Sequence, residues 1–336
     1  MVFSPTYLLF MFTLMLSILL SISSSSWFSA WIGLELNMMS FIPLITMKPS
    51  SSLSESALKY FLIQALGSTL FIMSSSLYIS MSPLASPLIL TALLLKLASS
   101  PFHFWFPQVM QGLLWPQAII LMTIQKLAPL ILISYLSFSY IMIQIIILSS
   151  MLSAMMGSIG GLNSMHLRKV MAFSSINHMS WMLIAILISE MLLIMYFTLY
   201  SLITTSVIVL LYMFNTYNFH DLLKSNFNNM MYLFVLPLSL MSLGGLPPFT
   251  GFIPKWMMIQ AMLQNNMIFP LMILLASALI TLYFYMRILI PFIIMNNPSM
   301  SFNMMHLWSS SFMYPMSLIS FFNLSGLLIP MMFIIL

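Results

Sequence analysis

Residues 94–107 read LLKLASSPFHFWFP, and residues 242–255 read SLGGLPPFTGFIPK. Each segment interrupts an apolar run with Pro-Phe, four further residues and a second proline. Proline lacks a backbone N–H and disturbs the carbonyl one turn earlier, so in hydrocarbon the freed groups need partners from protein or from water in a cavity. A matched pair of such breaks predicts a transporter built as an inverted repeat, with its working site near the membrane midplane.

A lysine lies beside each break, Lys96 at the first and Lys255 at the second. Without these lysines, two kinked helices that only pack against their neighbours would explain the segments equally well. Charge inside a membrane is costly and is therefore usually functional. The two lysines thus favour a transport function over simple packing.

The composition is that of a membrane protein. Of 336 residues, 62% are hydrophobic and 4% are charged, whereas soluble domains are about one quarter charged. Cysteine is absent, which excludes disulfides and thiolate-bound metal or iron–sulfur centres within this chain. The nine basic and four acidic residues are too scattered for a nucleic-acid surface, which needs clustered lysine and arginine.

Methionine is unusually abundant, with 38 residues. Methionine packs acceptably in apolar cores, but no fold demands this many. The excess indicates a coding bias of the kind found in animal mitochondrial genomes. The amino terminus shows no arginine-rich amphipathic presequence, as expected of a protein made inside the organelle. We therefore expect a multi-pass membrane protein that is encoded in a mitochondrial genome.

We expect an all-α polytopic fold of about eleven membrane spans, with residues 1–336 forming a single integral membrane domain. The fourth span is broken near Pro101, and the ninth is broken between Gly244 and Pro248. Spans one to five (about 5–136) then correspond to spans six to ten (about 140–294) as two five-helix bundles, and because five is odd the two halves enter from opposite faces. The extra carboxyl-terminal helix, 312–336, has no counterpart. The expected spans are 5–23, 27–46, 57–80, 88–112, 115–136, 140–161, 168–188, 191–213, 231–263, 268–294 and 312–336.

The basic residues of the links support this count. Lys48, Arg168, Lys169 and Lys224 fall in links after even-numbered spans, with Lys59 at the border of the first of these. Positive charge accumulates on the inner side of membrane proteins. This asymmetry predicts an amino terminus on the matrix side and a carboxyl terminus on the intermembrane-space side.

Three charged residues of the first half lie in the predicted membrane spans, at a depth where burying a charge in hydrocarbon is costly. Glu35 is near the centre of the second span, Lys96 is central in the fourth, and Lys126 is central in the fifth. Dry surroundings favour the neutral form of such groups, and an opposite charge nearby favours the charged form. We hypothesise a Glu35–Lys96 couple that hands a proton towards Lys126. The alternative for Glu35 is a carboxyl that only stabilises packing.

In the second half, His178 is central in the seventh span and Lys255 directly follows the second break. Histidine titrates near neutral pH, which suits a proton relay. The alternative is a hydrogen-bonded core histidine without a transport role. The candidate site is therefore a proton relay of Glu35, Lys96, Lys126, His178 and Lys255. It includes no metal-binding or cofactor-binding residue.

Other residues carry weaker signals. Glu55 and Lys59 are four residues apart, which is typical of a helical ion pair at the interface, although an entry role in the relay is an equal alternative. Arg287 is expected to snorkel towards the membrane surface, and His103 is a weak candidate because it lies near the first break. No phosphate-binding glycine pattern and no metal-ligand spacing occurs.

Several motifs, in order along nearly the whole chain, resemble those of one family, the NADH-ubiquinone oxidoreductase chain 2 family. Its members are the mitochondrially encoded, antiporter-like membrane subunits of respiratory complex I. The bias towards methionine and serine resembles insect or other arthropod members. Ser99, Ser100 and Ser180 stand where relatives often have alanine or glycine, which affects none of the proposed carriers. The motifs are WIGLELN (31–37), KYF (59–61), Lys96 before PFHFWFP (101–107), Lys126 before Pro129, Arg168-Lys169 before FSSINH (173–178), and LGGLPPFTGFIPK (243–255).

The resemblance implies a proton-pumping module in the membrane arm of an H⁺-translocating NADH:ubiquinone reductase. By motif, the family's row of charged residues corresponds to Glu35, Lys96, Lys126 and Lys255, together with His178. The resemblance also implies that flavin, iron–sulfur clusters and the quinone site belong to partner subunits. The expected partners are other membrane-arm and accessory subunits and lipids, with protons as the transported species and no nucleic acid.

Two other functions are compatible with the residues alone. A stand-alone cation/proton antiporter would share the fold and the lysines, and co-purification with a large NADH-oxidising assembly would separate it from a complex I subunit. A structural membrane scaffold would use the charges only for pairing. Loss of pumping with retained assembly after substitution of Lys96 would exclude the scaffold.

Overall fold

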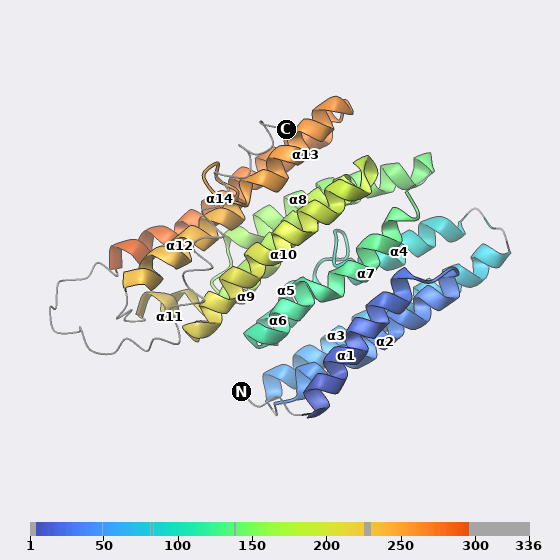
Figure 1. Ribbon diagram of the computed structural model, residues 1–336, viewed down its shortest axis with the longest axis horizontal. Coiled ribbons are helices and arrows are strands. Elements are labelled where there is room, and N and C mark those ends of the chain that lie inside the picture. The colour runs from blue at the N-terminus through green and yellow to red at the C-terminus, as the bar shows by residue number, and fades with distance from the viewer. Residues whose placement is uncertain are drawn as a thin grey trace. The chain divides into compact units, whose positions relative to one another are not determined.

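The computed structural model describes residues 5–48, 50–80, 82, 84–137, 139–224 and 230–295. Over these ranges the regular structure is helical, apart from an isolated antiparallel bridge between His166 and Asn218. The chain divides into two compact units, Met1–Met156 and Gly157–Leu336, and helix α8 (Tyr140–Leu162) runs across the boundary between them. Figure 1 labels these helices and colours them by residue number along the chain.

In the first unit, α1 packs against α2, and α2 packs against α3. Helix α3 also contacts α4 and α5, while α7 lies against α4, α6 and α1. These contacts surround the first break with helices on several sides. The elements are α1 (Pro5–Ile22), α2 (Trp27–Thr46), α3 (Ser51–Ile79), α4 (Ala85–Leu97), α5 (Trp105–Gly112), α6 (Trp115–Met122), α7 (Ile124–Ser134) and α8 (Tyr140–Leu162).

The second unit is built around α9, whose side chains are buried along most of the helix. Helices α10, α13 and α14 pack against it, and α12 contacts α10 and α14. The core of this unit therefore lies along the helix that carries His178. The elements are α9 (Leu167–Ile188), α10 (Glu190–Met213), α11 (Phe219–Lys224), α12 (Met230–Gly244), α13 (Phe252–Gln264) and α14 (Ile268–Met295).

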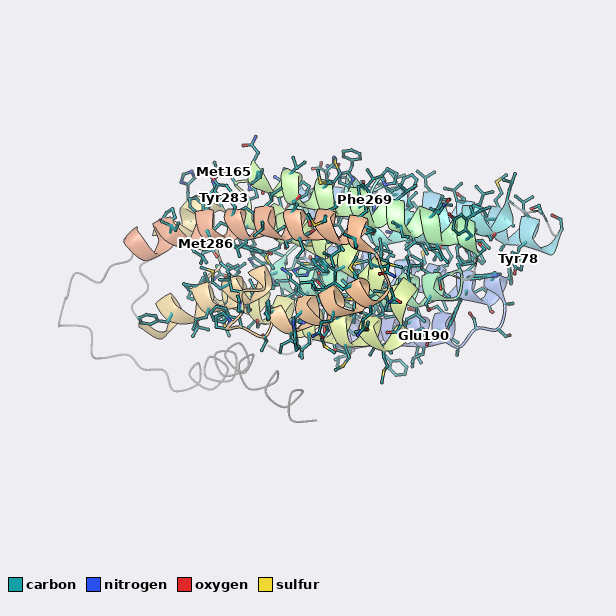
Figure 2. All side chains as sticks on the ribbon, turned by 90° about the horizontal axis from the view of Figure 1, so that it is seen from above. Tyr78, Met165, Glu190, Phe269, Tyr283 and Met286 are labelled. Atoms are coloured by element: carbon teal, nitrogen blue, oxygen red, sulfur yellow. The ribbon has the colours of Figure 1, made fainter. Side chains whose placement is uncertain are left out.

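Eight helices of the described part are long and apolar enough to cross a membrane. Their outward side chains are large and apolar, as the lipid-facing surface of a membrane protein requires. Phe269 and Tyr283 of α14, both labelled in Figure 2, are 69% and 61% exposed. The fold is that of a polytopic α-helical membrane protein.

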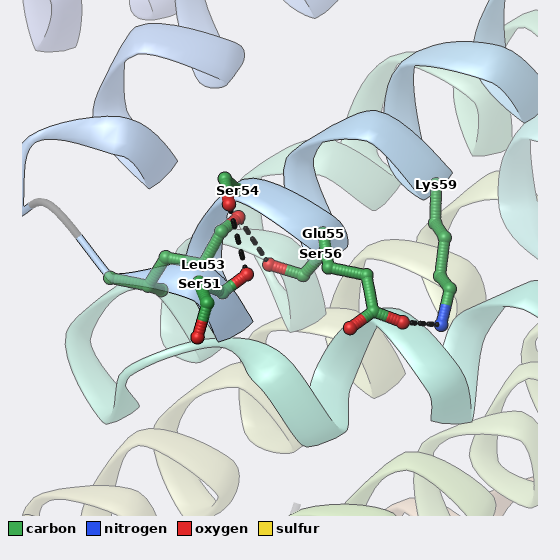
Figure 3. Close-up of polar contacts among 6 residues, drawn as sticks. All are labelled: Ser51, Leu53, Ser54, Glu55, Ser56 and Lys59. Carbon is green, nitrogen blue, oxygen red and sulfur yellow. Dashed lines mark hydrogen bonds and ion pairs between the residues drawn. The ribbon is translucent and has the colours of Figure 1, made fainter.

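Serine is accommodated in these apolar helices because its hydroxyl bonds within its own helix. Ser17, Ser74 and Ser174 each donate to the carbonyl three residues earlier, at 2.6–2.8 Å. The same contact appears at the start of α3, where Ser54 donates to Ser51 and Ser56 to Leu53 (Figure 3). A buried hydroxyl satisfied in this way needs no partner from another helix.

The predicted helical ion pair near the start of α3 is confirmed. Lys59 Nζ lies 2.6 Å from Glu55 Oε1, and both side chains are exposed (Figure 3). Exposed pairs of this kind contribute little to stability, because solvent screens the two charges. The pair therefore fits local stabilisation of the helix.

Several predicted boundaries differ from the structure. Helix α3 begins at Ser51 rather than at residue 57, because the Ser50 hydroxyl caps it by accepting from the Leu53 amide. The predicted span 115–136 is interrupted at Thr123, and Arg168 and Lys169 lie in the first turn of α9 rather than in a link. The predicted helix 312–336 lies outside the described residues, and the inverted repeat stays a prediction.

Candidate functional site

The first break follows Leu97, the last residue of α4. Ala98 takes a left-handed backbone conformation, with φ of 60°, which ends the helix. Two side chains then supply donors to carbonyls of the last turn: Trp105 Nε1 bonds Leu95 O at 3.2 Å, and Gln64 Nε2 bonds Lys96 O at 3.4 Å. The chain itself therefore satisfies groups that hydrocarbon would leave without partners.

Lys96 lies in the last turn of α4 and is 8% exposed. Its stem runs along α3 at Gly67, where an added Cβ would lie 3.2 Å from Lys96 Cγ. Glu35 lies on α2 and is half-buried. The two side chains form no ion pair, since the ion pair found among the described side chains is Lys59–Glu55.

Lys126 lies in α7, three residues after the interruption at Thr123, and is 3% exposed. Its Nζ is 4.9 Å from the centre of the Phe106 ring, within the range of a cation–π contact. The helix is weakened further along, because Pro129 has no N–H to give to the carbonyl of Gln125. Lys126 is thus buried between two irregular points of its helix.

Lys96 and Lys126 line the same buried cavity of about 20 Å³. Apolar and aromatic side chains, among them Trp105 and Phe106, form much of the wall. The polar groups that line it are, besides the two lysines, Asn37, Tyr60, Gln64 and Gln125. A space of this size in a polar setting is large enough for a water molecule.

At the second break, the backbone carbonyl at the end of the helix finds its partner in a different way. Helix α12 ends at Gly244, and Gly245 continues with φ of 77°, a conformation that favours glycine. Lys255 is 6% exposed, and its Nζ donates to Gly244 O at 2.7 Å. A cation at the carboxyl end of a helix is also favoured by the helix dipole. At this break, a lysine takes the capping role that the Trp105 indole and Gln64 amide have at the first.

His178 lies in α9 within a group of buried tyrosines. Its Nδ1 is 3.0 Å from the Tyr196 hydroxyl oxygen, and its ring lies 5.1 Å from the Tyr200 ring centre. The neighbouring Asn177 accepts from the Ser277 hydroxyl at 2.9 Å, which ties α9 to α14. The polar core of this unit is therefore a hydrogen-bonded group around His178.

The structure brings some of the predicted relay residues together within each unit. Lys96 and Lys126 share one cavity of the first unit, whereas Glu35, on α2, is not among the residues that line it. His178 and Lys255 are both buried in the second unit, on α9 and α13. His103, the weak candidate, is buried near the first break, and Arg287 is exposed and donates to Leu162 O.

Sequence reasoning missed the neutral polar residues around these charges. The main ones are Tyr60, Gln64, Gln125 and Tyr196, which come from different helices. Two of them carried a signal: Gln125 directly precedes Lys126 in an otherwise apolar run, and Tyr60 belongs to the KYF motif (59–61). The described residues contain no group of three or more histidine, aspartate or glutamate side chains that could hold a metal ion.

Comparison with known proteins assigns the chain to a family. The family model for the transmembrane part of NADH:quinone oxidoreductase/Mrp antiporter subunits matches residues 24–84 and 76–281. NADH-ubiquinone oxidoreductase chain 2 of Anopheles gambiae is 42% identical over 97% of this chain and 98% of its own length. That of Aedes aegypti is 41% identical over 96% of each. The chain belongs to the NADH-ubiquinone oxidoreductase chain 2 family.

Solved structures of low sequence identity share the fold. A chain of respiratory complex I from Thermus thermophilus superposes with a TM-score of 0.81 at 22% identity, covering 97% of this chain and 78% of that one. A chain of the Mrp complex from Dietzia sp. gives a TM-score of 0.74 at 16% identity, covering 82% and 58%. The antiporter-like fold class predicted from the helix breaks is confirmed.

Proposed function

We propose that this chain is a proton-translocating subunit in the membrane arm of mitochondrial NADH-ubiquinone oxidoreductase. Its family membership supports this assignment, as do charged side chains buried inside an apolar fold. In this proposal NADH oxidation and quinone reduction take place in partner subunits, which hold the flavin and the iron–sulfur clusters. The chain contributes proton transfer to the H⁺-translocating NADH:ubiquinone reductase reaction.

The proposed location is the mitochondrial inner membrane, with the amino terminus on the matrix side. The distribution of basic residues supports this orientation. Lys48 is exposed in the link between α2 and α3, and Arg168 and Lys169 lie at the start of α9. By the positive-inside rule these ends of the helices face the matrix.

One observation carries the proposal: Lys96 and Lys126, from separate helices, line the same cavity. Two amines that share a polar space can exchange a proton if one is protonated and the other is neutral. In the first unit we assign this exchange to Lys96 and Lys126, with Glu35 biasing the charge on Lys96. In the second unit we assign the corresponding step to His178 and Lys255.

The experiment that tests this function uses the assembled complex with Lys126→Met in this chain. Methionine keeps much of the apolar stem and cannot carry a proton. We expect the variant to assemble, as measured by native electrophoresis, and to translocate protons at least about tenfold more slowly in sealed vesicles, since a positioned proton-transfer group contributes about 10²-fold or more. Proton translocation at the unaltered rate in an assembled Lys126→Met complex would overturn the proposal.

The likeness to the Mrp complex supports a second candidate, a cation/proton antiporter that acts without NADH. The two candidates differ in what drives proton movement. A complex I subunit moves protons only while the assembly oxidises NADH. An antiporter exchanges protons for sodium or potassium ions, so a gradient of either cation drives proton movement in the opposite direction. Vesicles with such a gradient and no NADH therefore distinguish the two.

A further inference from the structure

Two polar atoms of the cavity lined by Lys96 and Lys126 have no hydrogen-bond partner among the residues that the structure describes. Asn37 Oδ1, on α2, is buried and has no hydrogen-bond donor in reach among the described residues. Gln125 Nε2, at the start of α7, is buried and has no acceptor among them. A buried polar atom without a partner is costly, so each such atom in a native fold needs an explanation.

A hydrogen bond fixes the orientation of the Gln125 side chain in this cavity. Its Oε1 accepts a hydrogen bond from the Tyr60 hydroxyl at 3.2 Å, across 65 positions of the chain. Tyr60 itself is 2% exposed and is packed against the rings of Phe41 and Trp105. Because Tyr60 occupies the amide oxygen, the group that Gln125 leaves for the cavity is its N–H donor.

Four of the polar groups that line the cavity, those of Asn37, Gln125 and the two lysines, match the hydrogen-bonding capacity of one water molecule. A water has two O–H donors and two acceptor lone pairs. One O–H of the water donates to Asn37 Oδ1, and one lone pair accepts from the Gln125 N–H. The second lone pair accepts from a protonated lysine, and the second O–H donates to a neutral lysine. The cavity volume of about 20 Å³ suits a single water.

We propose that Asn37 and Gln125, with Tyr60 holding Gln125, form a water site that orients one water between Lys96 and Lys126. The water receives a proton from the charged amine through one lone pair and gives a different proton to the neutral amine. Charge therefore moves from one lysine to the other, and the water is restored. Asn37, Gln125 and Tyr60 act as positioning residues. This inference rests on the proposed function, because it assumes that the two lysines exchange a proton.

The test compares two buried glutamines in the assembled complex. Gln125→Met removes the donor from the water site and keeps most of the side-chain volume. Gln117→Met is the matched control, because Gln117 is also buried but donates to Leu44 O and Ile45 O, outside the cavity. Two quantities are measured for each variant in sealed vesicles, the rate of proton translocation per assembled complex and its solvent deuterium isotope effect.

We expect Gln125→Met to slow proton translocation by about tenfold or more and to raise the isotope effect, because transfer through a poorly oriented water becomes rate-limiting. Gln117→Met lowers the amount of assembled complex and leaves both quantities unchanged. Tyr60→Phe gives a smaller loss and adds nothing in a Gln125→Met background, since Tyr60 acts through Gln125. If Gln125→Met does not assemble, Tyr60→Phe with Asn37→Leu repeats the test.

The outcomes separate this inference from the proposed function. If Lys126→Met stops proton translocation but Gln125→Met changes neither rate nor isotope effect, the water site is wrong and the relay stands. If Lys126→Met itself has no effect, the relay fails and the water site fails with it. Equal changes in Gln125→Met and Gln117→Met would indicate a purely structural role for Gln125 and would also overturn the inference.

Discussion

At the scale of single residues, three of the buried ionisable groups each contact a neutral partner. Lys255 donates to a backbone carbonyl, His178 contacts a tyrosine hydroxyl, and Lys126 lies over an aromatic ring. A close ion pair would hold the charged form of such a group strongly, whereas a neutral partner stabilises it less. Neutral partners therefore suit side chains that bind and release protons repeatedly.

The contact between His178 and Tyr196 gives the first prediction at this scale. The partner of one ring nitrogen fixes which nitrogen carries the proton, so Tyr196→Phe loosens the orientation of His178. A neutral hydrogen bond contributes about 0.5–1.5 kcal/mol, and we expect proton translocation to slow by about two- to tenfold. Tyr283→Phe, on the exposed side of α14, is the control and should leave the rate unchanged. Equal rates in both variants would exclude a role for Tyr196.

At the scale of the elements, each helix break depends on a glycine that lets a lysine lie close to the backbone. Gly67 of α3 faces the stem of Lys96, and Gly245 follows the end of α12 beside Lys255. An added Cβ at Gly245 would lie 2.8 Å from Lys255 Nζ. The two glycines therefore set the positions of both lysines.

Gly67→Val is expected to displace Lys96 from the cavity, because its added carbon would lie 3.1 Å from Leu95 and 3.2 Å from Lys96. The matched control is Leu66→Val, one residue earlier, where the side chain is 60% exposed. We expect Gly67→Val to slow proton translocation about tenfold in the assembled complex and Leu66→Val to leave it unaltered. A wild-type rate in Gly67→Val would show that α3 does not position Lys96.

Gly245→Ala is expected to destabilise the second break. A left-handed conformation costs a residue with a Cβ about 1–2 kcal/mol, and Lys255 would also have to move. Gly244→Ala is the control, because its added carbon would make ordinary contacts of 3.7 Å or more. Thermal unfolding of the assembled complex should start at a lower temperature for Gly245→Ala only. Equal melting of the two variants would contradict the account.

The positions of the breaks and of the buried lysines could be predicted from sequence because both depend on local chemistry. Proline and glycine influence the backbone conformation at their own positions. A lysine within an apolar run is recognised directly from the sequence. The Tyr60–Gln125 hydrogen bond could not be predicted, because it joins side chains 65 positions apart whose meeting depends on how α3 and α7 pack. The interruption at Thr123 also lacked a signal, since neither proline nor glycine stands there.

At the scale of the whole molecule, the described part of each compact unit contains a pair of helices separated by a proline-containing break, with a buried lysine beside the break. The first unit has α4, α5 and Lys96, and the second has α12, α13 and Lys255. Each unit also adds a second buried ionisable group, Lys126 or His178. This arrangement is what an inverted repeat with two proton-handling halves would contain, and the repeat itself stays a prediction.

The proposed orientation can be tested because the chain contains no cysteine. Lys48 and Ser25 lie in successive links and are both exposed, so a cysteine at either position reports the side on which that link lies. We expect Lys48→Cys to react with a membrane-impermeant maleimide from the matrix side and Ser25→Cys from the intermembrane-space side. The reverse pattern would place the amino terminus on the opposite face.

The most direct test of proton exchange between the buried lysines compares Lys96→Arg with Lys96→Met in the assembled complex. Arginine keeps the positive charge but does not release its proton at physiological pH. A carrier role predicts that both variants lose proton translocation, measured as protons moved per second in sealed vesicles oxidising NADH. Wild-type translocation in Lys96→Arg, with loss in Lys96→Met, would show that a fixed charge is sufficient and would contradict the relay.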